Sequence, residues 1–355
     1  MNTSKRAILF PVTIGCCVLF GQYCGARADE SIEAKYLKNV RQVTDGMVKA
    51  GEGYFSPDGR TVIYQAVPSG YPFYQIYTQP LDGGRPRLVS TGRGRTTCSF
   101  FAPDGRHILF ASSHLDPRLE QTEADARRQQ AEDEASERRR RYQWDFDPHM
   151  DIFETDLDGG NPRRLTDADG YDAEGAYSPD GRLIAFTSDR DGDPDLFVMN
   201  ADGSGLRRLN DAPGYDGGPF VSPNGRWVVF RSDRKQEGFL QIYVIGIDGR
   251  HETALTDNVG VNWAPYWHPT ESYIIWTGAD HSQPGVRPNY DLWLMKYEVR
   301  GDEFLPGAVT RITDHPSADV LPVFSPDGRR LMWTSNRTAG GESQLFIADF
   351  TLPEH

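Results

Sequence analysis

Cysteine is scarce in this sequence, and its positions limit disulfide chemistry. Three of the four cysteines fall within the first 28 residues, which leaves Cys98 alone in the rest of the chain. Residues 1–28 have the features of a secretory signal peptide: a basic start, an apolar run over 7–20 and an Ala-Arg-Ala sequence at 26–28. We therefore expect a periplasmic or secreted protein whose mature chain, 29–355, contains no internal disulfide.

Long apolar runs and an excess of positive charge are also lacking. The run over 7–20 is too short to cross a bilayer, and no longer run follows it, so we expect no membrane span. The 38 lysines and arginines are outnumbered by 51 aspartates and glutamates, which gives a formal net charge of −13. Proteins that bind nucleic acid carry basic patches, so this charge argues against a nucleic-acid partner.

Two common catalytic signatures are missing as well. No Gly-x-Ser-x-Gly sequence marks a hydrolase nucleophile. The eight histidines show none of the short spacings that are typical of a zinc site. The sequence therefore indicates no catalytic residue.

Turn-forming residues are abundant instead, and they recur in versions of one tetrad, most often Ser-Pro-Asp-Gly. The tetrads occupy 56–59, 102–105, 178–181, 222–225, 268–271 and 325–328. Their first positions differ by 46, 76, 44, 46 and 57 residues. Four short apolar or β-branched runs accompany each tetrad, as in the third repeat at 173–177, 183–186, 195–198 and 206–209. Four strands in a repeat of about 45 residues are typical of β-propellers, so we predict an all-β, six-bladed propeller over 29–355.

The last repeat ends after its third strand, and the missing outer strand has a counterpart near the N-terminus. Residues 42–45, Gln-Val-Thr-Asp, resemble the outer-strand sequence Arg-Leu-Thr-Asp at 164–167. The N-terminal strand is therefore predicted to complete the last blade. This would remove the two unpaired strand edges of an open ring.

The 76-residue spacing predicts an insertion in the second blade, at about 115–150 and between its second and third strands. Residues 119–141 are rich in helix-forming residues and contain few apolar ones. The insertion is either a solvated helical projection or a lid or docking arm for a partner. The four arginines at 138–141, followed by aromatic residues that include Trp144, favour the second interpretation.

Polar residues of the first strands are predicted to surround one mouth of the central channel. In a propeller blade, the loop before the first strand and the loop between the second and third strands lie on one face, which here carries the insertion. Strand alternation would place the residues four and six before each tetrad on the same side. With two tryptophans of this face, the candidate ligand-binding residues are Glu52, Trp144, Asp172, Glu174, Asp216, Asn262, Trp263 and Asp319.

Converging carboxylates either raise their pKa values or recruit a cation. Asp172, Glu174 and Asp216 belong to adjacent blades, and their oxygen ligands would suit Ca²⁺ or another divalent cation. The alternative is an acidic, water-filled vestibule without metal.

The repeats resemble those of a known family. The tetrads, and the sequence AFTSDRDGDPDLFVMNADGSGLRRL at 185–209, are similar to the Pro-Asp propeller repeats of the TolB family. The resemblance implies a periplasmic, six-bladed and non-enzymatic propeller that binds the peptidoglycan-associated lipoprotein at its channel mouth. Family members also carry an α/β domain before the propeller, for which the residues between Asp29 and the first expected strand leave no room.

Two functions remain open from the sequence. The first is a monomeric binding module whose partner is a protein, such as an envelope lipoprotein, or a small molecule or saccharide. The alternative is a metal-dependent carbohydrate-active enzyme, a lyase or hydrolase, because some propellers of this repeat type resemble oligogalacturonate lyases with a histidine cluster in the channel. Convergence of two or more of His149, His268, His281 and His315 would favour the enzyme.

Overall fold

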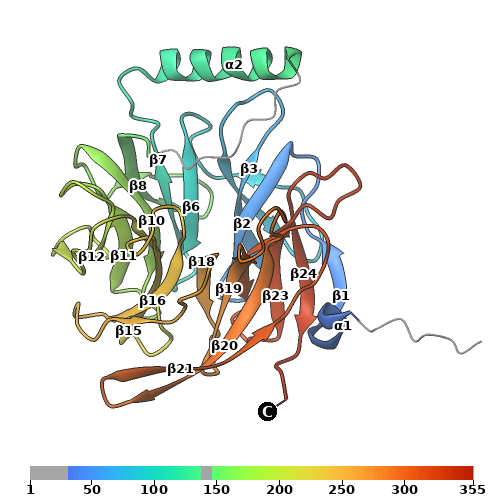
Figure 1. Ribbon diagram of the computed structural model, residues 1–355. Coiled ribbons are helices and arrows are strands. Elements are labelled where there is room, and N and C mark those ends of the chain that lie inside the picture. The colour runs from blue at the N-terminus through green and yellow to red at the C-terminus, as the bar shows by residue number, and fades with distance from the viewer. Residues whose placement is uncertain (1–30, 137–145, 355) are drawn as a thin grey trace, which may run out of the picture. The chain divides into compact units, whose positions relative to one another are not determined.

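The computed structural model describes residues 31–136 and 146–354, and β-strands dominate this part of the chain (Figure 1). Four separate sheets contain four strands each. The first consists of β2 (Lys49–Phe55), β3 (Thr61–Val67), β4 (Gln75–Pro80) and β5 (Arg87–Leu88). The next two consist of β14 (Asp216–Val221), β15 (Trp227–Ser232), β16 (Gln241–Gly246) and β17 (Thr253–Ala254), and of β18 (Gly260–Trp267), β19 (Tyr273–Asp280), β20 (Asp291–Arg300) and β21 (Glu303–Arg311). The last contains β22 (Asp319–Phe324), β23 (Arg330–Ser335), β24 (Gln344–Phe350) and β1 (Leu37–Gln42).

The remaining sheet has eight strands and joins the second and third repeats. It contains β6 (Thr96–Phe101), β7 (His107–Ser112), β8 (His149–Asp156), β9 (Arg163–Arg164), β10 (Gly170–Tyr177), β11 (Leu183–Ser188), β12 (Asp195–Asn200) and β13 (Arg207–Arg208). The connection is a parallel pairing of two residues, Gly170 with His149 and Tyr171 with Met150.

The prediction of an all-β propeller is confirmed, but the prediction of six separate blades is wrong. Among the described residues, four blades are separate and one sheet spans two repeats. The physical reason lies in two early strand starts. Strand β8 begins two residues before Asp151, whereas the matching strand β12 begins at the equivalent Asp195, and β10 begins two residues before Asp172, whereas β14 begins at the equivalent Asp216. The additional residues of β8 and β10 pair with each other and merge the sheets.

The first strands of the repeats converge around a centre. Each of β2, β6, β10, β14, β18 and β22 contacts the next, and β22 returns to β2. Apolar side chains between neighbouring sheets form the core, with Tyr64, Phe110, Phe186, Phe230 and Trp333 among the largest fully buried groups. No helix among the described residues is long and apolar enough to cross a membrane.

The N-terminal strand closes the ring, as predicted, but it lies earlier in the chain than expected. Strand β1 pairs antiparallel with β24, from Leu37 opposite Phe350 to Gln42 opposite Phe346. The matched segment 42–45 begins at the last residue of this strand. Its Thr44 hydroxyl accepts a hydrogen bond from the Leu345 amide at 2.9 Å. In the second repeat, Thr166 accepts from the Ile152 amide in the same way. The segment 42–45 is therefore equivalent to the matching segments of the other repeats. The residues of β1 that pair with β24 run from Leu37 to Gln42, so most of them lie before this segment.

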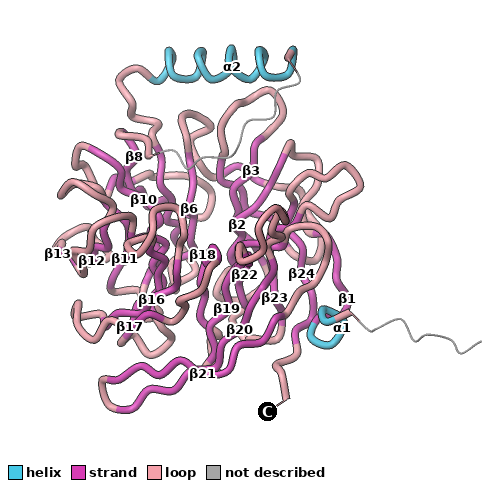
Figure 2. Tube along the Cα trace, in the orientation of Figure 1, coloured by secondary structure: helices cyan, strands magenta, loops and turns pink. Residues whose placement is uncertain are grey.

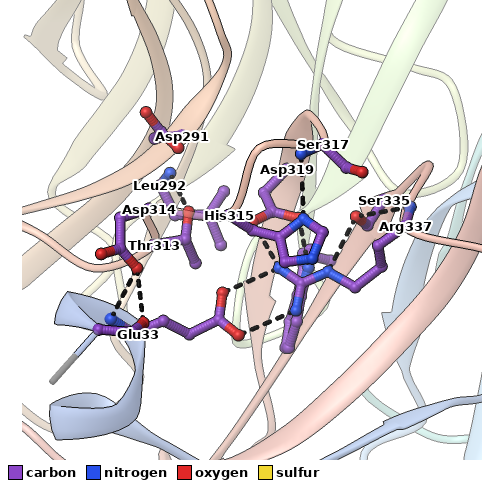
Figure 3. Close-up of polar contacts among 12 residues, drawn as sticks. Glu33, Asp291, Leu292, Thr313, Asp314, His315, Ser317, Asp319, Ser335 and Arg337 are labelled. Carbon is purple, nitrogen blue, oxygen red and sulfur yellow. Dashed lines mark hydrogen bonds and ion pairs between the residues drawn. The ribbon is translucent and has the colours of Figure 1, made fainter. Parts of the chain in front are cut away.

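A short helix, α1 (Ile32–Tyr36), precedes β1 and is attached to the last two repeats (Figure 3). The Asp314 carboxylate accepts hydrogen bonds from the Ser31 hydroxyl and from the Ile32 and Glu33 amides, at 2.8, 2.9 and 3.1 Å. Arg337 binds both Glu33 oxygens at 2.9 Å and also binds Asp319 at 2.7 Å. These contacts fix the start of the closing strand.

The predicted helical insertion is present as α2 (Leu119–Ala135), between β7 and β8. The helix lies beyond one end of the strands (Figures 1 and 2). Among its residues only Glu123 is buried, and this carboxylate accepts hydrogen bonds from Tyr71, the Arg93 side chain and the Gly94 amide at 2.8, 2.8 and 3.3 Å. The Glu123 carboxylate therefore anchors the helix to loops of the first sheet, and Arg127 of the helix adds a contact with the Tyr71 ring.

Candidate functional site

A cavity of about 560 Å³ lies where the first strands converge. Residues from loops between second and third strands line it, including Tyr74, Phe146 and Tyr290. The insertion that carries α2 is a loop of the same kind, since it also joins the second and third strands of its repeat. The cavity therefore belongs to the face of the propeller that was predicted to bind a ligand.

Four aromatic side chains pack against each other at the centre of the ring. They stand two residues before their tetrads, and ring centroids of neighbouring members lie 5.0–6.1 Å apart. The four are Tyr54, Phe100, Phe220 and Tyr266. Three of them, all except Phe100, line the cavity. This aromatic layer separates the cavity from the tetrad turns.

The residue four positions before each tetrad, on the first strand, has a left-handed backbone conformation. Its φ is positive in every repeat, and each inner strand shows a register shift or bulge around it. The φ angles are 48° at Glu52, 51° at Cys98, 60° at Glu174, 61° at Gly218, 51° at Ala264 and 57° at Leu321. All of these residues line the cavity, and we call them the bulge ring.

One carboxylate of the bulge ring is fully paired. Glu174 accepts a 3.0 Å hydrogen bond from the half-buried Arg231 guanidinium and hydrogen bonds from the Tyr215 hydroxyl and the Gly218 amide. A side chain at position 218 would collide with Arg231, because a Cβ there would lie 2.1 Å from the guanidinium nitrogen. Glycine thus makes room for this ion pair.

The other carboxylate, Glu52, has only uncharged direct partners. The Tyr54 hydroxyl donates to it at 3.4 Å, and the Cys98 thiol faces it. Burial raises the pKa of Glu52 to about 7. The positive charge of Arg231 lowers this pKa, but the negative charge of Glu174 opposes that effect. Burial also raises the pKa of the Cys98 thiol. Glu52 can therefore exchange a proton near neutral pH.

The residues six before the tetrads do not face the cavity. In three repeats a carboxylate at this position binds the arginine that follows the second strand, at 2.7–2.9 Å. The pairs are Asp172 with Arg190, Asp216 with Arg234 and Asp319 with Arg337. Each arginine also lies over aromatic rings of its own sheet. Asn262 instead accepts from the Trp276 indole at 2.9 Å and donates to Gln241.

The structure therefore divides the predicted site residues. Glu52, Glu174 and Trp263 line the cavity, whereas Asp172, Asp216, Asn262 and Asp319 do not. The expectation that both sets share one side fails because the left-handed bulge residue interrupts the strand alternation between them. Trp144 lies outside the described residues.

The structure does not bring the proposed metal ligands together. Asp172 and Asp216 are each occupied by an arginine, and Glu174 is occupied by Arg231. Across residues 31–136 and 146–354, no three histidine, cysteine, aspartate or glutamate side chains form a group that could hold a metal ion.

The four histidines considered for an enzymatic site have separate surroundings. His149 lies 3.6 Å from Asp116, and the His268 ring packs on Phe324. The His281 ring contacts Phe239, and His315 accepts a hydrogen bond from the Ser317 amide, as Figure 3 shows.

The sequence predictions did not include Arg231, Tyr215 or, apart from Trp263, the other aromatic residues of the cavity wall. A signal for Arg231 was present: aligned on the tetrads, the ninth position after the tetrad's first residue is Gln65, Ala111, Thr187, Arg231, Thr277 and Thr334. Arg231 is the only charged member of this column, which lies on the second strands beside the bulge ring.

Comparisons with known proteins agree with this architecture. Residues 144–235 match the family model described as the TolB beta propeller domain. A TolB-type protein from Agrobacterium tumefaciens is 20% identical with a TM-score of 0.58, over 88% of this chain and 97% of that one. TolB from Acinetobacter baumannii is 18% identical with a TM-score of 0.54, over 86% of this chain and 65% of that one.

A third similar structure is an enzyme. The oligogalacturonate lyase from Vibrio parahaemolyticus is 14% identical with a TM-score of 0.52, over 89% of this chain and 94% of that one. At these identities the structural likenesses establish the fold alone. The match at residues 144–235 shows repeats similar to those of the TolB propeller, and the two TolB structures share the β-propeller fold of this chain.

Proposed function

We propose that this protein is a periplasmic or secreted binding module, and that it takes a segment of a partner protein into the central cavity. It is built as a propeller of six repeats, two of which share a sheet. The cavity of about 560 Å³ carries the proposal, because concave sites with apolar walls and a few polar groups are the usual binding sites of proteins. The signal-like N-terminal sequence and the TolB-like repeats support the location.

The walls of the cavity suit a protein ligand. The aromatic side chains Tyr74, Phe146, Tyr215, Trp263 and Tyr290 surround it. Tyrosine and tryptophan provide large contact areas at a small entropic cost and are enriched at binding hot spots.

The opposite face is built for turn formation. In the first tetrad, the Ser56 hydroxyl donates to Asp58 at 2.6 Å, and Asp58 accepts from the Arg60 amide at 3.0 Å. The same contacts recur at Ser178 and Ser325. Because these polar side chains form hydrogen bonds within their own turns, they are less available to a ligand. This favours the cavity face as the binding face.

Photo-crosslinking in the native host tests the proposal. The photoreactive residue benzoylphenylalanine would replace Tyr290 at the cavity, or the exposed Glu271 in a tetrad turn as a control. We expect a specific protein adduct from position 290 and none from position 271. Equal adducts from both positions, or none from position 290, would contradict the proposed function.

A carbohydrate-active enzyme is the second candidate. Glu52, with its pKa raised to about 7 by burial, has the property of a group that transfers protons, and aromatic walls also suit sugar rings. Oligogalacturonate with added Mn²⁺ or Ca²⁺ would be the first substrate to assay, by the ultraviolet absorbance of unsaturated products. Turnover that is lost in Glu52→Gln would support the enzyme, and no turnover above a blank would reject this substrate class.

A further inference from the structure

The bulge ring is chemically asymmetric. The members from β2, β6 and β10 are Glu52, Cys98 and Glu174, whereas those from β14, β18 and β22 are a glycine, an alanine and a leucine. All of them line one cavity, so a ligand would meet polar groups on one side and apolar groups on the other.

Charge within the cavity is not balanced. Arg231 is half-buried, and its guanidinium is held by Glu174 at 3.0 Å and by the Tyr215 hydroxyl at 2.6 Å. Glu52 is only 9% exposed, and its direct partners, Tyr54 and Cys98, carry no charge in their usual states. A buried carboxylate is costly unless a cation or hydrogen bonds compensate it. The cavity therefore has a place for one positive group beside Glu52.

A serine hydroxyl in the cavity has no hydrogen-bond partner among the described residues. Ser99 is 2% exposed, lines the cavity next to Cys98, and its hydroxyl forms no hydrogen bond. Buried hydroxyls are nearly always satisfied, so an unpaired one in a cavity indicates a site for a ligand atom or a water molecule. This observation is independent of the charge on Glu52.

Aromatic walls provide a further means of holding a cation. Ammonium and guanidinium groups are attracted to the faces of tyrosine and tryptophan rings. The protein already uses this contact beside the cavity, where the Lys49 ammonium lies 4.6 Å from the centroid of the Tyr74 ring. The methylene groups of a long basic side chain would in turn contact the apolar half of the bulge ring.

We propose that the cavity binds a lysine or arginine side chain of the partner polypeptide, with its charged end at Glu52 and its stem among the aromatic walls. This inference rests on the proposed function, and it specifies the chemistry of the inserted group. Charge complementarity selects the occupant. Among the described residues, Glu52 and Asp233 are the cavity carboxylates without an ion pair to an arginine or lysine. Asp233 accepts hydrogen bonds from the Tyr215 and Gly238 amides. Glu52, in contrast, has only the neutral Tyr54 and Cys98 side chains beside it.

Isothermal titration calorimetry at pH 8 and low salt tests it with four peptides of the form acetyl-Gly-Ser-X-Ser-Gly-amide. X is lysine, arginine, norleucine or glutamate. We expect the lysine or the arginine peptide to bind about tenfold or more tightly than the norleucine peptide, which corresponds to one charge-assisted contact. The Glu52→Gln variant should bring both basic peptides close to the norleucine peptide. Glu271→Gln, the same change in an exposed tetrad turn, should alter nothing.

The outcomes separate this inference from the proposed function. Equal binding of the norleucine and basic peptides, or unchanged binding in a folded Glu52→Gln variant, would overturn it. If the crosslink from position 290 identifies a partner segment without a basic residue, the inference fails and the binding function stands. If position 290 gives no adduct and no peptide binds, both fail.

Discussion

At the scale of single residues, one backbone position in each repeat decides what the cavity contains. Non-glycine residues with positive φ are uncommon and cost of order 1–3 kcal/mol each, and they cluster where a structure needs a side chain in a particular direction. Here five such residues occupy the same position of the bulge ring. The strain turns Glu52, Cys98 and Glu174 toward the channel. In three repeats the residue two positions earlier is an aspartate that pairs with an arginine instead.

The first prediction concerns Glu52. Its folded-state pKa is raised from 4.5 to about 7, so wild-type stability is complete below pH 4.5 and is lost as pH rises toward 7. A shift of this size corresponds to about 3 kcal/mol. The Glu52→Gln variant lacks this cost, so its free energy of unfolding should exceed that of wild type by up to about 3 kcal/mol above pH 7, and match it near pH 4.5.

Urea unfolding between pH 4.5 and 8 measures this difference. A Glu52→Gln variant that is less stable than wild type at pH 8 would mean that the carboxylate is paired and stabilising, which contradicts the description of the cavity.

The second prediction concerns Asp172, which is fully buried and bound through both oxygens to Arg190. Replacement by asparagine leaves the half-buried Arg190 guanidinium without its counter-charge, and we expect this to cost about 2–4 kcal/mol, less than for a fully buried pair. The exposed Asp169→Asn, in the same loop region, should change the free energy of unfolding by less than about 0.5 kcal/mol. Chemical denaturation compares the two, and a small effect at Asp172 would show that its ion pair is dispensable.

These pairs also mark the limit of reasoning from the sequence. Alignment of the repeats on their tetrads correctly grouped four residues as equivalent: Asp172, Asp216, Asn262 and Asp319. It could not show a left-handed residue between them and the channel, because five of the six bulge positions carry ordinary residues such as glutamate and leucine rather than glycine or asparagine. The prediction assumed that side chains alternate regularly along the first strand, but the bulge residue interrupts this alternation.

At the scale of elements, Glu123 is the one buried residue of the described inserted helix and forms its main contact with the first sheet. Helix α2 buries only Glu123, whose pKa is lowered because hydrogen bonds from Arg93 and Tyr71 outweigh the effect of burial. The third prediction is that Glu123→Gln weakens these charge-assisted bonds and lowers the free energy of unfolding by about 1–2 kcal/mol. Glu120→Gln, exposed in the first turn of the same helix, should have no measurable effect.

Thermal melting measures the stability change, and hydrogen exchange of the α2 amides would show whether the helix is released. Unchanged protection of α2 in Glu123→Gln would contradict the anchoring role of this residue.

The elements themselves were well predicted where turn chemistry repeats. The tetrads, the strands around them and the helix in the second repeat all follow from local sequence, because proline, aspartate and glycine set the turns and alternating runs set the strands. The merging of β8 with β10 was not predictable. It depends on two residues at each strand start, and their pairing is set by tertiary geometry rather than by propensity.

At the scale of the whole molecule, closure of the ring joins the two ends of the described chain. Leu37 is 4% exposed and packs in one core cluster with Phe350, while Glu33 binds Arg337. Burying a leucine contributes about 1.5–3 kcal/mol, and an unpaired β24 would expose a strand edge.

The fourth prediction is that a protein starting at Val43 melts about 5 °C or more below one starting at Ser31. It should also aggregate on heating more readily. Equal melting temperatures would mean that β1 contributes nothing to closure, in contradiction to its pairing with β24.

The protonation state of Glu52 decides whether the cavity can take a basic group, and one measurement tests this protonation state directly. Nuclear magnetic resonance titration of protein labelled with ¹³C at the glutamate side-chain carboxyl, with the Glu52 signal assigned by its loss in Glu52→Gln, reports the pKa of this group. The structure predicts a midpoint of about 7, from burial beside Glu174 without a directly bound cation. A midpoint at or below the ordinary value of 4.5 would show that Glu52 is charged and already paired, and would contradict the cavity as a site for a basic group.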